Sequence, residues 1–598
     1  MKLSDYVIDF VSRSGPRHLF LLPGGGSMHL VDSAGRQAGL EYVCCLHEQA
    51  CAYAAEAYAE YTGGLGAVLV TTGPGGTNAI TGLAAAWIDS TSCLFLSGQV
   101  KRADMIGDRG VRSMGPQEVD IVSVVRPLTK YAATVMEPES VRYHLEKAVW
   151  LATHGRHGPV WIEVPLDVQA AEIDERNLAG FEPPEPCGDR DTLPRQVAEA
   201  IALLNRAERP AVLLGNGARA AFGKLAPLLA RLGVPVLTTW KAVDLLADDD
   251  PLFAGRPGAV GQRGANFTQQ NADCLLILGA RLDLPQTAFD HANFARGATK
   301  IMVDIDAAEI AKMGTAIDLP VCADAAAFVE ELARQGEALR RGGREPWMER
   351  VREWRRRYPP IGPEHWRPEE GTVNFYAFLD ALSDTLPEGE LIVPGSSGPC
   401  SEIFMQAFRV KRGQRIVNAP GLGAMGTGLP GAIGACLANG RQRTISIIGD
   451  GGFQLNIQDL ETVRRLALPI KFFVLSNGGY GSIMTMQKTH FQGRYVASEP
   501  SSGLTLPDVV RVAAAYRLDT ATISGHAHLR EAMAEVLAMA GPVVCSVPVS
   551  PQQAIAPRVA SRLGADGVMV STPMEDMWPF LTREELASNM RAQGSAKQ

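Results

Sequence analysis

Short runs of apolar residues, rich in β-branched and aromatic side chains, recur along the chain between longer stretches with helical character. Most runs end at or near a Gly, Asp, Asn, Ser, Thr or Pro, as strands do before a turn. They predict strands over residues 65–72, 92–98, 159–165, 210–217, 274–280, 300–306, 444–450, 471–477 and 542–549. Continuously apolar strands separated by helices are typical of parallel sheets covered on both faces. We therefore predict an α/β protein of doubly wound parallel sheets.

Two charged, Pro-rich stretches interrupt this pattern, at residues 181–194 and 340–371. We interpret them as linkers, which divide the chain into domains over 1–180, 195–340 and 370–550 and a C-terminal tail over 551–598. Each domain has the size of one α/β unit. The aromatic and Met residues of the tail are compatible with a cover over a site and with packing on the surface.

Composition narrows the class of protein. The 57 Lys and Arg against 65 Asp and Glu give a net charge of −8, which argues against non-specific nucleic-acid binding. No apolar run approaches the roughly 18 residues that span a membrane. The N-terminus lacks the pattern of a signal peptide, so we expect a cytoplasmic protein. Ten scattered Cys residues without CxxC pairs predict reduced thiols rather than disulfides or a zinc site.

Polar residues flanked by glycines close two predicted strands within residues 444–483. Asp450 ends the first strand and Asn477 ends the next one along the chain. Each strand end alone would be interpreted as a turn. The carboxyl ends of parallel strands meet at one edge of a sheet, where open α/β sheets bind ligands. Two oxygen ligands beside glycines suit Mg²⁺ and a diphosphate, so together they predict such a site.

This arrangement resembles the thiamine-diphosphate signature. Segments 46–63, 71–100 and 421–435 are also similar to stretches of acetohydroxyacid synthase-like thiamine-diphosphate enzymes. The resemblance implies an N-terminal pyrimidine-binding domain, a middle domain and a C-terminal diphosphate-binding domain. It implies Asp450, Asn477 and Gly479 as ligands of Mg²⁺. The cofactor contacts that it implies are Glu48, Gly395, Ser396, Ser397, Gly423, Met425, Gly449, Asp450, Gly451, Gly452, Asn477, Gly479 and Tyr480.

The resemblance assigns roles to three of these residues. A Glu at the position of Glu48 hydrogen-bonds the pyrimidine N1′ and favours the imino tautomer of the 4′-amino group, whereas most Glu residues lie on a helix surface. Met425 would hold the cofactor in a V shape, which brings its reacting groups together. The carbonyl of Gly423 would accept a hydrogen bond from the 4′-amino group.

The reaction pocket is implied by two further loops. Gln117 matches a family residue that lines this pocket. Gly25 and Gly26 match a glycine loop whose N–H groups would bind the carboxylate of the substrate, so we count them with Glu48 and Gln117 as catalytic. His29 follows this loop and is a weaker acid–base candidate, because a lone His is more often structural.

The middle domain resembles that of the FAD-binding acetohydroxyacid synthases at residues 277–287, 300–312 and 321–328. This implies FAD as a further cofactor. Related decarboxylases keep the domain without a flavin, so that alternative stays open. The residues implied in FAD binding are Gly215, Asn216, Gly217, Thr239, Arg281, Asp304, Ile305, Asp324 and Ala325.

The stretch after Asn477 departs from the acetohydroxyacid synthases proper. Met486 stands where they have a Trp that helps select 2-ketobutyrate as acceptor. The chain also lacks the adjacent His pair with which pyruvate decarboxylases release their product. Residues 22–33 and 476–504 resemble YerE-type carboligases of the yersiniose pathway, which join two carbons to a CDP-linked deoxyketosugar.

We therefore predict a thiamine-diphosphate- and Mg²⁺-dependent transferase that decarboxylates pyruvate and adds the two-carbon unit to a ketone or ketosugar. Lys488 and Arg494 are candidates for binding the phosphates of such an acceptor, and equally for solvated surface charges. The alternatives are an acetolactate synthase that condenses two pyruvates and a non-catalytic subunit that keeps the fold. In the family Glu48 and Asp450 meet across a subunit interface, so we expect a homodimer or homotetramer without nucleic acid or membrane partners.

Overall fold

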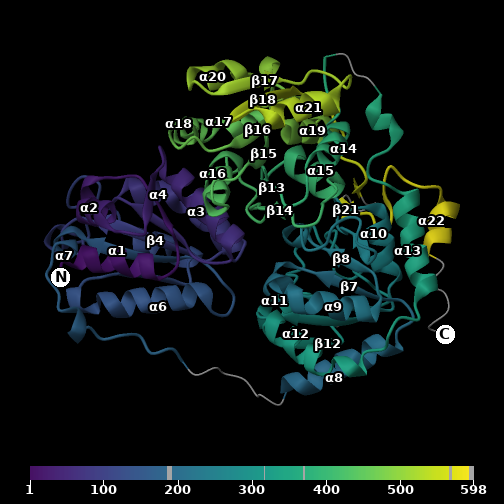
Figure 1. Cartoon of the computed structure of the whole chain (residues 1–598), viewed down its shortest axis with the longest axis horizontal. Coiled ribbons are helices and arrows are strands. Elements are labelled where there is room, and N and C mark those ends of the chain that lie inside the picture. Colours follow the sequence, from purple (N-terminus) through teal and green to yellow (C-terminus); the bar gives the residue numbers. More distant parts are fainter. Residues whose placement is uncertain (185–191, 315–316, 368–370, 564–568, 591–598) are drawn as a thin grey trace.

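The computed structural model describes residues 1–184, 192–314, 317–367, 371–563 and 569–590. Three sheets of six strands follow one another along the chain, and every strand pair within them is parallel. Helices cover both faces of each sheet (Figure 1). The predicted α/β fold of doubly wound parallel sheets is confirmed.

The first lobe holds the sheet with strand order β2-β1-β3-β4-β6-β5 and is drawn in purple and blue in Figure 1. Its strands are β1 (His18–Leu21), β2 (Glu41–Cys44), β3 (Gly66–Val70), β4 (Cys93–Gln99), β5 (Tyr131–Thr134) and β6 (Val160–Pro165). Its helices are α1 (Leu3–Arg13), α2 (Met28–Arg36), α3 (Glu48–Thr62), α4 (Pro74–Ile88), α5 (Ile121–Val125), α6 (Val141–Thr153) and α7 (Leu166–Gln169).

The middle lobe holds the sheet with strand order β12-β11-β10-β7-β8-β9. Its strands are β7 (Pro210–Leu214), β8 (Val236–Thr238), β9 (Phe253–Gly255), β10 (Cys274–Leu278), β11 (Thr299–Asp304) and β12 (Leu319–Cys322). Its helices are α8 (Thr192–Arg206), α9 (Phe222–Leu232), α10 (Arg263–Asn271), α11 (Ala307–Ala311), α12 (Ala325–Arg334) and α13 (Glu345–Arg357).

The third lobe holds the sheet with strand order β14-β13-β15-β16-β18-β17. Its strands are β13 (Leu391–Pro394), β14 (Arg415–Ile416), β15 (Thr444–Gly449), β16 (Ile470–Ser476), β17 (Asp519–Thr522) and β18 (Val543–Pro548). Its helices are α14 (Phe375–Thr385), α15 (Pro399–Ala407), α16 (Gly428–Ala438), α17 (Asp450–Gln454), α18 (Leu460–Arg465), α19 (Gly481–His490), α20 (Val509–Ala515) and α21 (Leu529–Ala538).

All nine strands expected from the apolar runs are present, each within a few residues of its predicted ends. Nine strands of the three sheets were not predicted: the six at the sheet edges, β2, β5, β9, β12, β14 and β17, and the short inner strands β1, β8 and β13. They have two to four residues each, and β2, β5 and β17 are largely half-buried or exposed. An edge strand has one neighbour and needs no long apolar run, so the pattern used for central strands misses it.

The first and third lobes pack against each other through α3 and α16, which lie side by side in Figure 1. Gly434 permits the close approach, because a Cβ there would lie 1.9 Å from the carbonyl oxygen of Ala54. One cluster of buried apolar residues continues from one lobe into the other. This contact lies within one chain. The meeting of Glu48 and Asp450 across a subunit interface stays a prediction.

The predicted linker at 340–371 is partly a packed helix. Within it, α13 buries Trp347 and Trp354 against the middle lobe. The tail adds the short strands β19 (Arg558–Val559), β20 (Ser561–Leu563), β21 (Met569–Ser571) and β22 (Met577–Trp578), and the helix α22 (Arg583–Met590). Trp354 Nε1 donates to Asn589 Oδ1 at 2.9 Å, so the end of the tail packs on the middle lobe.

Residues 185–191 of the other predicted linker lie outside the described residues. Among the helices that are described, none combines the length and the apolar character that crossing a bilayer requires.

Candidate active site

Asp450 and Asn477 lie at the carboxyl ends of the neighbouring strands β15 and β16, as the sequence predicted. Asp450 begins α17 and is 4% exposed. Its Oδ2 accepts from the backbone N–H of Asn477 at 3.0 Å and of Gly478 at 2.8 Å. Burial raises the pKa of this carboxyl, and the backbone N–H bonds lower it again in part. These bonds fix the carboxylate beside the next strand end.

Two of the glycines around this pair are required by close approach. A Cβ on Gly451 would lie 2.7 Å from the ring of Tyr480, and a Cβ on Gly479 would lie 2.4 Å from the carbonyl oxygen of Ser498. Asn477 Oδ1 accepts from the Gly479 N–H at 3.1 Å. An acidic oxygen and an amide oxygen among such glycines fit Mg²⁺ with a diphosphate, because Mg²⁺ takes its remaining ligands from phosphate and water. Consistently, the described residues contain no cluster of three or more His, Cys, Asp or Glu that would form an all-protein cage.

Ser396 lies at the end of β13, next to the same edge. Its hydroxyl accepts from Thr427 Oγ1 at 2.8 Å and from the Ala419 N–H at 3.3 Å. The Gly395 N–H donates to Ile447 O at 2.8 Å, and Ser397 O accepts from Cys400 Sγ at 2.9 Å. These residues therefore connect the β13 end to the loop that precedes α16.

The loop with Gly423 and Met425 closes over this edge. Gly423 has a φ of 62°, in the left-handed region that favours glycine. Met425 is half-buried, and its Cε lies 3.4 Å from where a Cβ on Gly451 would be. A Cβ on Gly452 would lie 3.8 Å from the N of Gly426, and Gly449 has open space around it. The structure thus brings the predicted loop onto the predicted metal edge.

Glu48 is the first residue of α3 and is 6% exposed. His47 caps the helix, with its Nδ1 accepting from the Gln49 N–H at 3.1 Å. Asn78 Nδ2 donates to Glu48 Oε2 at 3.0 Å and so fixes the carboxyl. A buried carboxyl with a single fixed side-chain partner is suited to a hydrogen bond with a ligand nitrogen.

Asn456 connects the Glu48 end of α3 to the Met425 loop. Its Nδ2 donates to Gln49 Oε1 at 3.0 Å and to Gly426 O at 2.8 Å. The Leu46 N–H also donates to Asp459 Oδ1, at 3.0 Å. The sequence reasoning missed Asn78 and Asn456. Asn78 lies within the recognised segment 71–100, which could have indicated it, but no local signal indicates Asn456.

The two predicted substrate loops meet at Thr71 and Thr72. The Gly26 N–H donates to Thr71 Oγ1 at 3.1 Å, so it has a partner within the chain, and its contact with a substrate stays a prediction. Gly25 is exposed with open space around it. Gln117 is exposed at a φ of 68° and its carbonyl lies 3.2 Å from Thr72 Oγ1.

The residues predicted to bind FAD gather at the carboxyl edge of the middle sheet. Many of their polar groups already have partners within the chain. The Gly215 and Gly217 N–H groups donate to Leu278 O and Gly279 O, and Arg281 Nη1 donates to Ile88 O at 2.6 Å.

The acidic and neutral members of this set are bonded as well. Asp304 Oδ1 accepts from the Asp306 N–H, and Asp324 caps α12 through the Ala326 N–H. The Thr239 N–H donates to Leu214 O, Asn216 Oδ1 accepts from Arg219, and Ile305 O accepts from Cys322 Sγ. Ala325, the first residue of α12, is buried. The edge therefore has few free groups for a dinucleotide.

The other candidates lie on the surface or among structural contacts. Met486, on α19, is 46% exposed, and Lys488 Nζ donates to Gln552 Oε1 at 3.3 Å. Arg494 is exposed, and burial lowers the pKa of His29, which is half-buried on α2. None of these observations assigns a role in a reaction.

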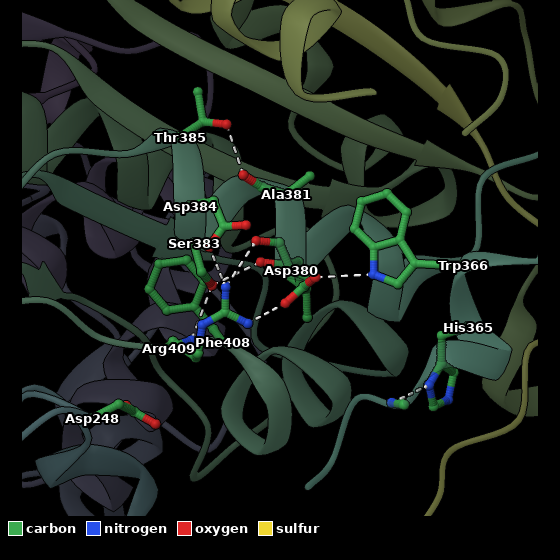
Figure 2. Close-up of polar contacts among 12 residues, drawn as sticks. Asp248, His365, Trp366, Asp380, Ala381, Ser383, Asp384, Thr385, Phe408 and Arg409 are labelled. Atoms are coloured by element: carbon green, nitrogen blue, oxygen red, sulfur yellow. Dashed lines mark hydrogen bonds and ion pairs between the residues drawn. The ribbon is translucent and has the colours of Figure 1, made fainter. Parts of the chain in front are cut away.

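A cavity of about 610 Å³ between the middle and third lobes contains none of the predicted site residues. Arg409 at its wall pairs with Asp380 and Asp384, and Trp366 Nε1 donates to Asp380 Oδ2 at 2.9 Å (Figure 2). Arg409, Asp380 and Asp384 neutralise one another, so we interpret this region as an interlobe junction.

Comparisons with known proteins agree with the geometry. The chain matches the N-terminal, central and C-terminal domain profiles of thiamine pyrophosphate (thiamine diphosphate) enzymes over residues 1–124, 197–332 and 397–547. It is 30% identical to an acetolactate synthase of Arthrospira platensis over 587 residues, which cover 93% of this chain and 95% of the relative.

Two further relatives extend the similarity to plants and enterobacteria. The chain is 31% identical to the chloroplastic acetolactate synthase 1 of Zea mays, over 94% of this chain and 87% of the relative. It is 31% identical to the large subunit of acetolactate synthase isozyme 3 of Escherichia coli, over 89% of this chain and 92% of the relative. With its three domains, its paired strand ends and its buried Glu48, the chain belongs to the family of thiamine pyrophosphate enzymes whose members include the acetolactate synthases.

Proposed function

We propose that this protein is a Mg²⁺- and thiamine-pyrophosphate-dependent carboligase that decarboxylates pyruvate and joins the two-carbon unit to a second pyruvate to give acetolactate. The observation that supports the carboligase proposal is that Asn456 joins Gln49, next to Glu48, to Gly426 of the Met425 loop, and that this loop lies beside the Asp450–Asn477 edge. The choice of acceptor is supported by relatives that are named acetolactate synthase and match nearly the whole chain.

The chain's own residues hold and orient the reacting partners. Asp450 and Asn477 would bind the metal, with the Gly451 and Gly479 backbone beside the diphosphate. Glu48, held by Asn78, would keep a proton at the pyrimidine nitrogen. The bound cofactor supplies the electron sink that accepts the electron pair left when CO₂ departs. Glu48 is buried, so little water reaches its carboxyl.

The ketosugar acceptor that the sequence suggested receives no support from these relatives, and the acetolactate alternative fits them better. A ketone carboligase stays the second candidate because Met486, in place of the family Trp, is exposed on α19. The smaller residue would leave more room beside the acceptor. The non-catalytic alternative is not favoured, because the metal pair and the buried Glu48 are intact.

We also propose FAD as a second cofactor at the middle edge, and a homodimer as the smallest active unit. The FAD proposal rests on the sequence resemblance, since the geometry there offers few free polar groups. The oxidised flavin absorbance of the purified protein, before and after FAD addition and gel filtration, tests it. A colourless protein after both steps would remove FAD from the proposal.

The test of the reaction uses the full chain with Mg²⁺, thiamine pyrophosphate and pyruvate. We expect acetolactate, measured by mass, at a rate unaffected by added ketones. Slow pyruvate turnover that accelerates with a ketone or a nucleotide-linked ketosugar would favour the second candidate. Glu48→Ala should abolish pyruvate consumption, whereas Glu331→Gln, a buried Glu in the middle lobe, should not. An active Glu48→Ala variant would contradict the proposed role of this carboxyl.

A further inference from the structure

A buried chain of hydrogen bonds runs behind the substrate loops of the first lobe. Glu163 lies on β6 and is 1% exposed. Its Oε1 accepts from Gln99 Nε2 at 2.8 Å, and its Oε2 accepts from Thr134 Oγ1 at 2.7 Å. A carboxyl is expensive to bury, and an apolar residue would fill this position at lower cost. Its presence therefore calls for an explanation other than stability.

Gln99, at the end of β4, connects Glu163 to the loop that carries Gln117. Its Nε2 also donates to Val119 O at 2.8 Å, and its Oε1 accepts from Thr72 Oγ1 at 2.7 Å and from the Val100 N–H at 2.9 Å. All four hydrogen-bonding positions of the amide are therefore filled. An amide fixed in this way cannot rotate without breaking several bonds, so the orientation of Glu163 fixes that of Val119 and Thr72.

Thr72 touches both substrate loops. Its hydroxyl bonds Gln99 and lies 3.2 Å from the carbonyl oxygen of Gln117. Its methyl group fills the space beside Gly26, where a Cβ would lie 2.6 Å from it. Gln117 adopts a left-handed φ of 68°, a conformation that costs a non-glycine residue on the order of 1 kcal/mol and therefore has to be held by contacts.

We propose that Glu163, Gln99 and Thr72 are positioning residues that hold the Gln117 loop and the glycine loop in the geometry that accepts pyruvate. This rests on the proposed function, because it takes these two loops as the substrate pocket. None of the three residues needs to touch the substrate. They act through the backbone of Gln117 and Gly26, and the chain of bonds gives the pocket a defined shape.

The protonation of Glu163 makes the hydrogen bonds between Glu163, Gln99 and Thr72 depend on pH. Burial is the main cause that raises the pKa of Glu163, and the charge of Asp120 at the start of α5 also raises it. The bonds from Thr134 and Gln99 lower it, and the resulting pKa is about 7. From β4 and β5 the residues that face it are the uncharged Gln99 and Thr134. In protonated Glu163, Oε1 can still accept from Gln99, but the O–H has to donate to Thr134 Oγ1, so the Thr134 bond reverses its direction and the charge that holds Gln99 is lost.

The test compares a variant that keeps the side-chain volume of Thr72 with one that keeps its hydroxyl. Thr72→Val removes the hydroxyl and keeps the volume, and we expect kcat/KM for pyruvate to fall about tenfold with unchanged thiamine pyrophosphate affinity. Thr72→Ser keeps the hydroxyl and should retain most of the activity. The matched control is Glu331→Gln, which alters a buried Glu remote from the loops.

The Glu163→Gln variant gives a second readout. Its amide mimics the protonated carboxyl, with the oxygen accepting from Gln99 and the nitrogen donating to Thr134, and it has no proton to titrate. The kcat/KM of the variant should therefore stay at the low-pH value of wild type and not change near pH 7. The free energy of unfolding of wild type should change with pH in the opposite direction to kcat/KM. Between the ordinary pKa of Glu and about 7 the folded wild type keeps a proton that the unfolded chain has lost, so wild-type stability should fall as pH rises through this interval and that of the variant should not.

The proposal is overturned if wild type consumes pyruvate while Thr72→Val and Glu163→Gln match it in kcat/KM and pH profile. It is also overturned if both variants lose thiamine pyrophosphate affinity and melting temperature in parallel with activity, since a general structural role predicts that result. A wild-type protein that binds the cofactor and consumes no pyruvate would instead refute the proposed function. The melting curves still report whether Glu163 titrates in that case.

Discussion

The middle and third sheets are both six-stranded and parallel, but their carboxyl edges serve different purposes. At the third edge, the side-chain oxygens of Asp450 and Asn477 are held in place by backbone N–H groups of their own loop. At the middle edge, the polar groups reach to other lobes. Arg281 donates to Ile88 O of the first lobe, and Lys241 Nζ bonds Asn418 O of the third lobe at 2.7 Å. One edge presents oxygens for a ligand, and the other joins the lobes.

The difference shows that a parallel sheet does not by itself make a binding site. Both edges collect strand ends, loops and helix starts. At the third edge, backbone N–H groups satisfy part of each polar side chain and leave acceptor capacity for a metal. At the middle edge, Lys241 also pairs with Glu60 at 2.8 Å and approaches Asp89 at 3.8 Å, so its charge is neutralised by the protein.

The largest expected effect is on the third edge. Asp450→Ala removes a metal ligand and should lower activity by about 100-fold or more, because the metal anchors the cofactor. The melting temperature without cofactor should stay close to wild type, since a buried carboxylate is removed with its desolvation cost. Activity assays across a Mg²⁺ titration and thermal unfolding measure both quantities.

The matched control for this change is Asp508→Ala. Asp508 also starts a helix of the third lobe, where it accepts from the Val510 and Arg511 N–H groups. We expect about 1 kcal/mol of lost stability and unchanged activity. Equal activity losses in the two variants would contradict the special role of the Asp450 edge.

The second effect is on stability at the middle edge. Lys241→Met leaves Glu60 buried without its ion-pair partner and should cost about 3–5 kcal/mol of unfolding free energy. Cofactor affinity measured by calorimetry on the folded protein should change little. Lys224→Met, which removes the exposed pair with Glu330, should cost less than about 1 kcal/mol. Similar losses for both would mean that the buried junction does not hold the lobes together.

The smallest expected effect is on stability at Asp324, which lies at the middle edge. Asp324→Ala removes the side-chain cap of α12, and chemical denaturation should show a loss of about 1 kcal/mol. Thiamine pyrophosphate affinity should be unchanged, because the residue belongs to the middle edge. If the purified wild type is yellow, the bound flavin of the variant shows whether this side chain also contacts FAD. A loss of thiamine pyrophosphate binding in this variant would remove the distinction between the two edges.

Much of the candidate site could be predicted because its signals are local. Asp450 and Asn477 each close an apolar strand and stand beside glycines, so their positions at one sheet edge follow from the chain itself. The role of Glu48 required the resemblance to a family, since nothing in its own helix distinguishes it from a surface Glu. Asn456, which connects Gln49 to Gly426, could not be predicted, because its partners are far away in sequence.

The sequence by itself determined the three parallel sheets, since central strands need uninterrupted apolar runs to be buried on both faces. It also determined that Asp450 and Asn477 lie at the carboxyl ends of neighbouring strands, because each residue directly follows an apolar strand. Only the tertiary structure decided that α13 and the tail pack on the middle lobe, that α3 and α16 join two lobes of one chain, and that the Gly26 N–H is bonded to Thr71. These features depend on which surfaces meet across long sequence separations, and a pattern of apolar and polar positions shows that a surface is to be buried without showing what buries it.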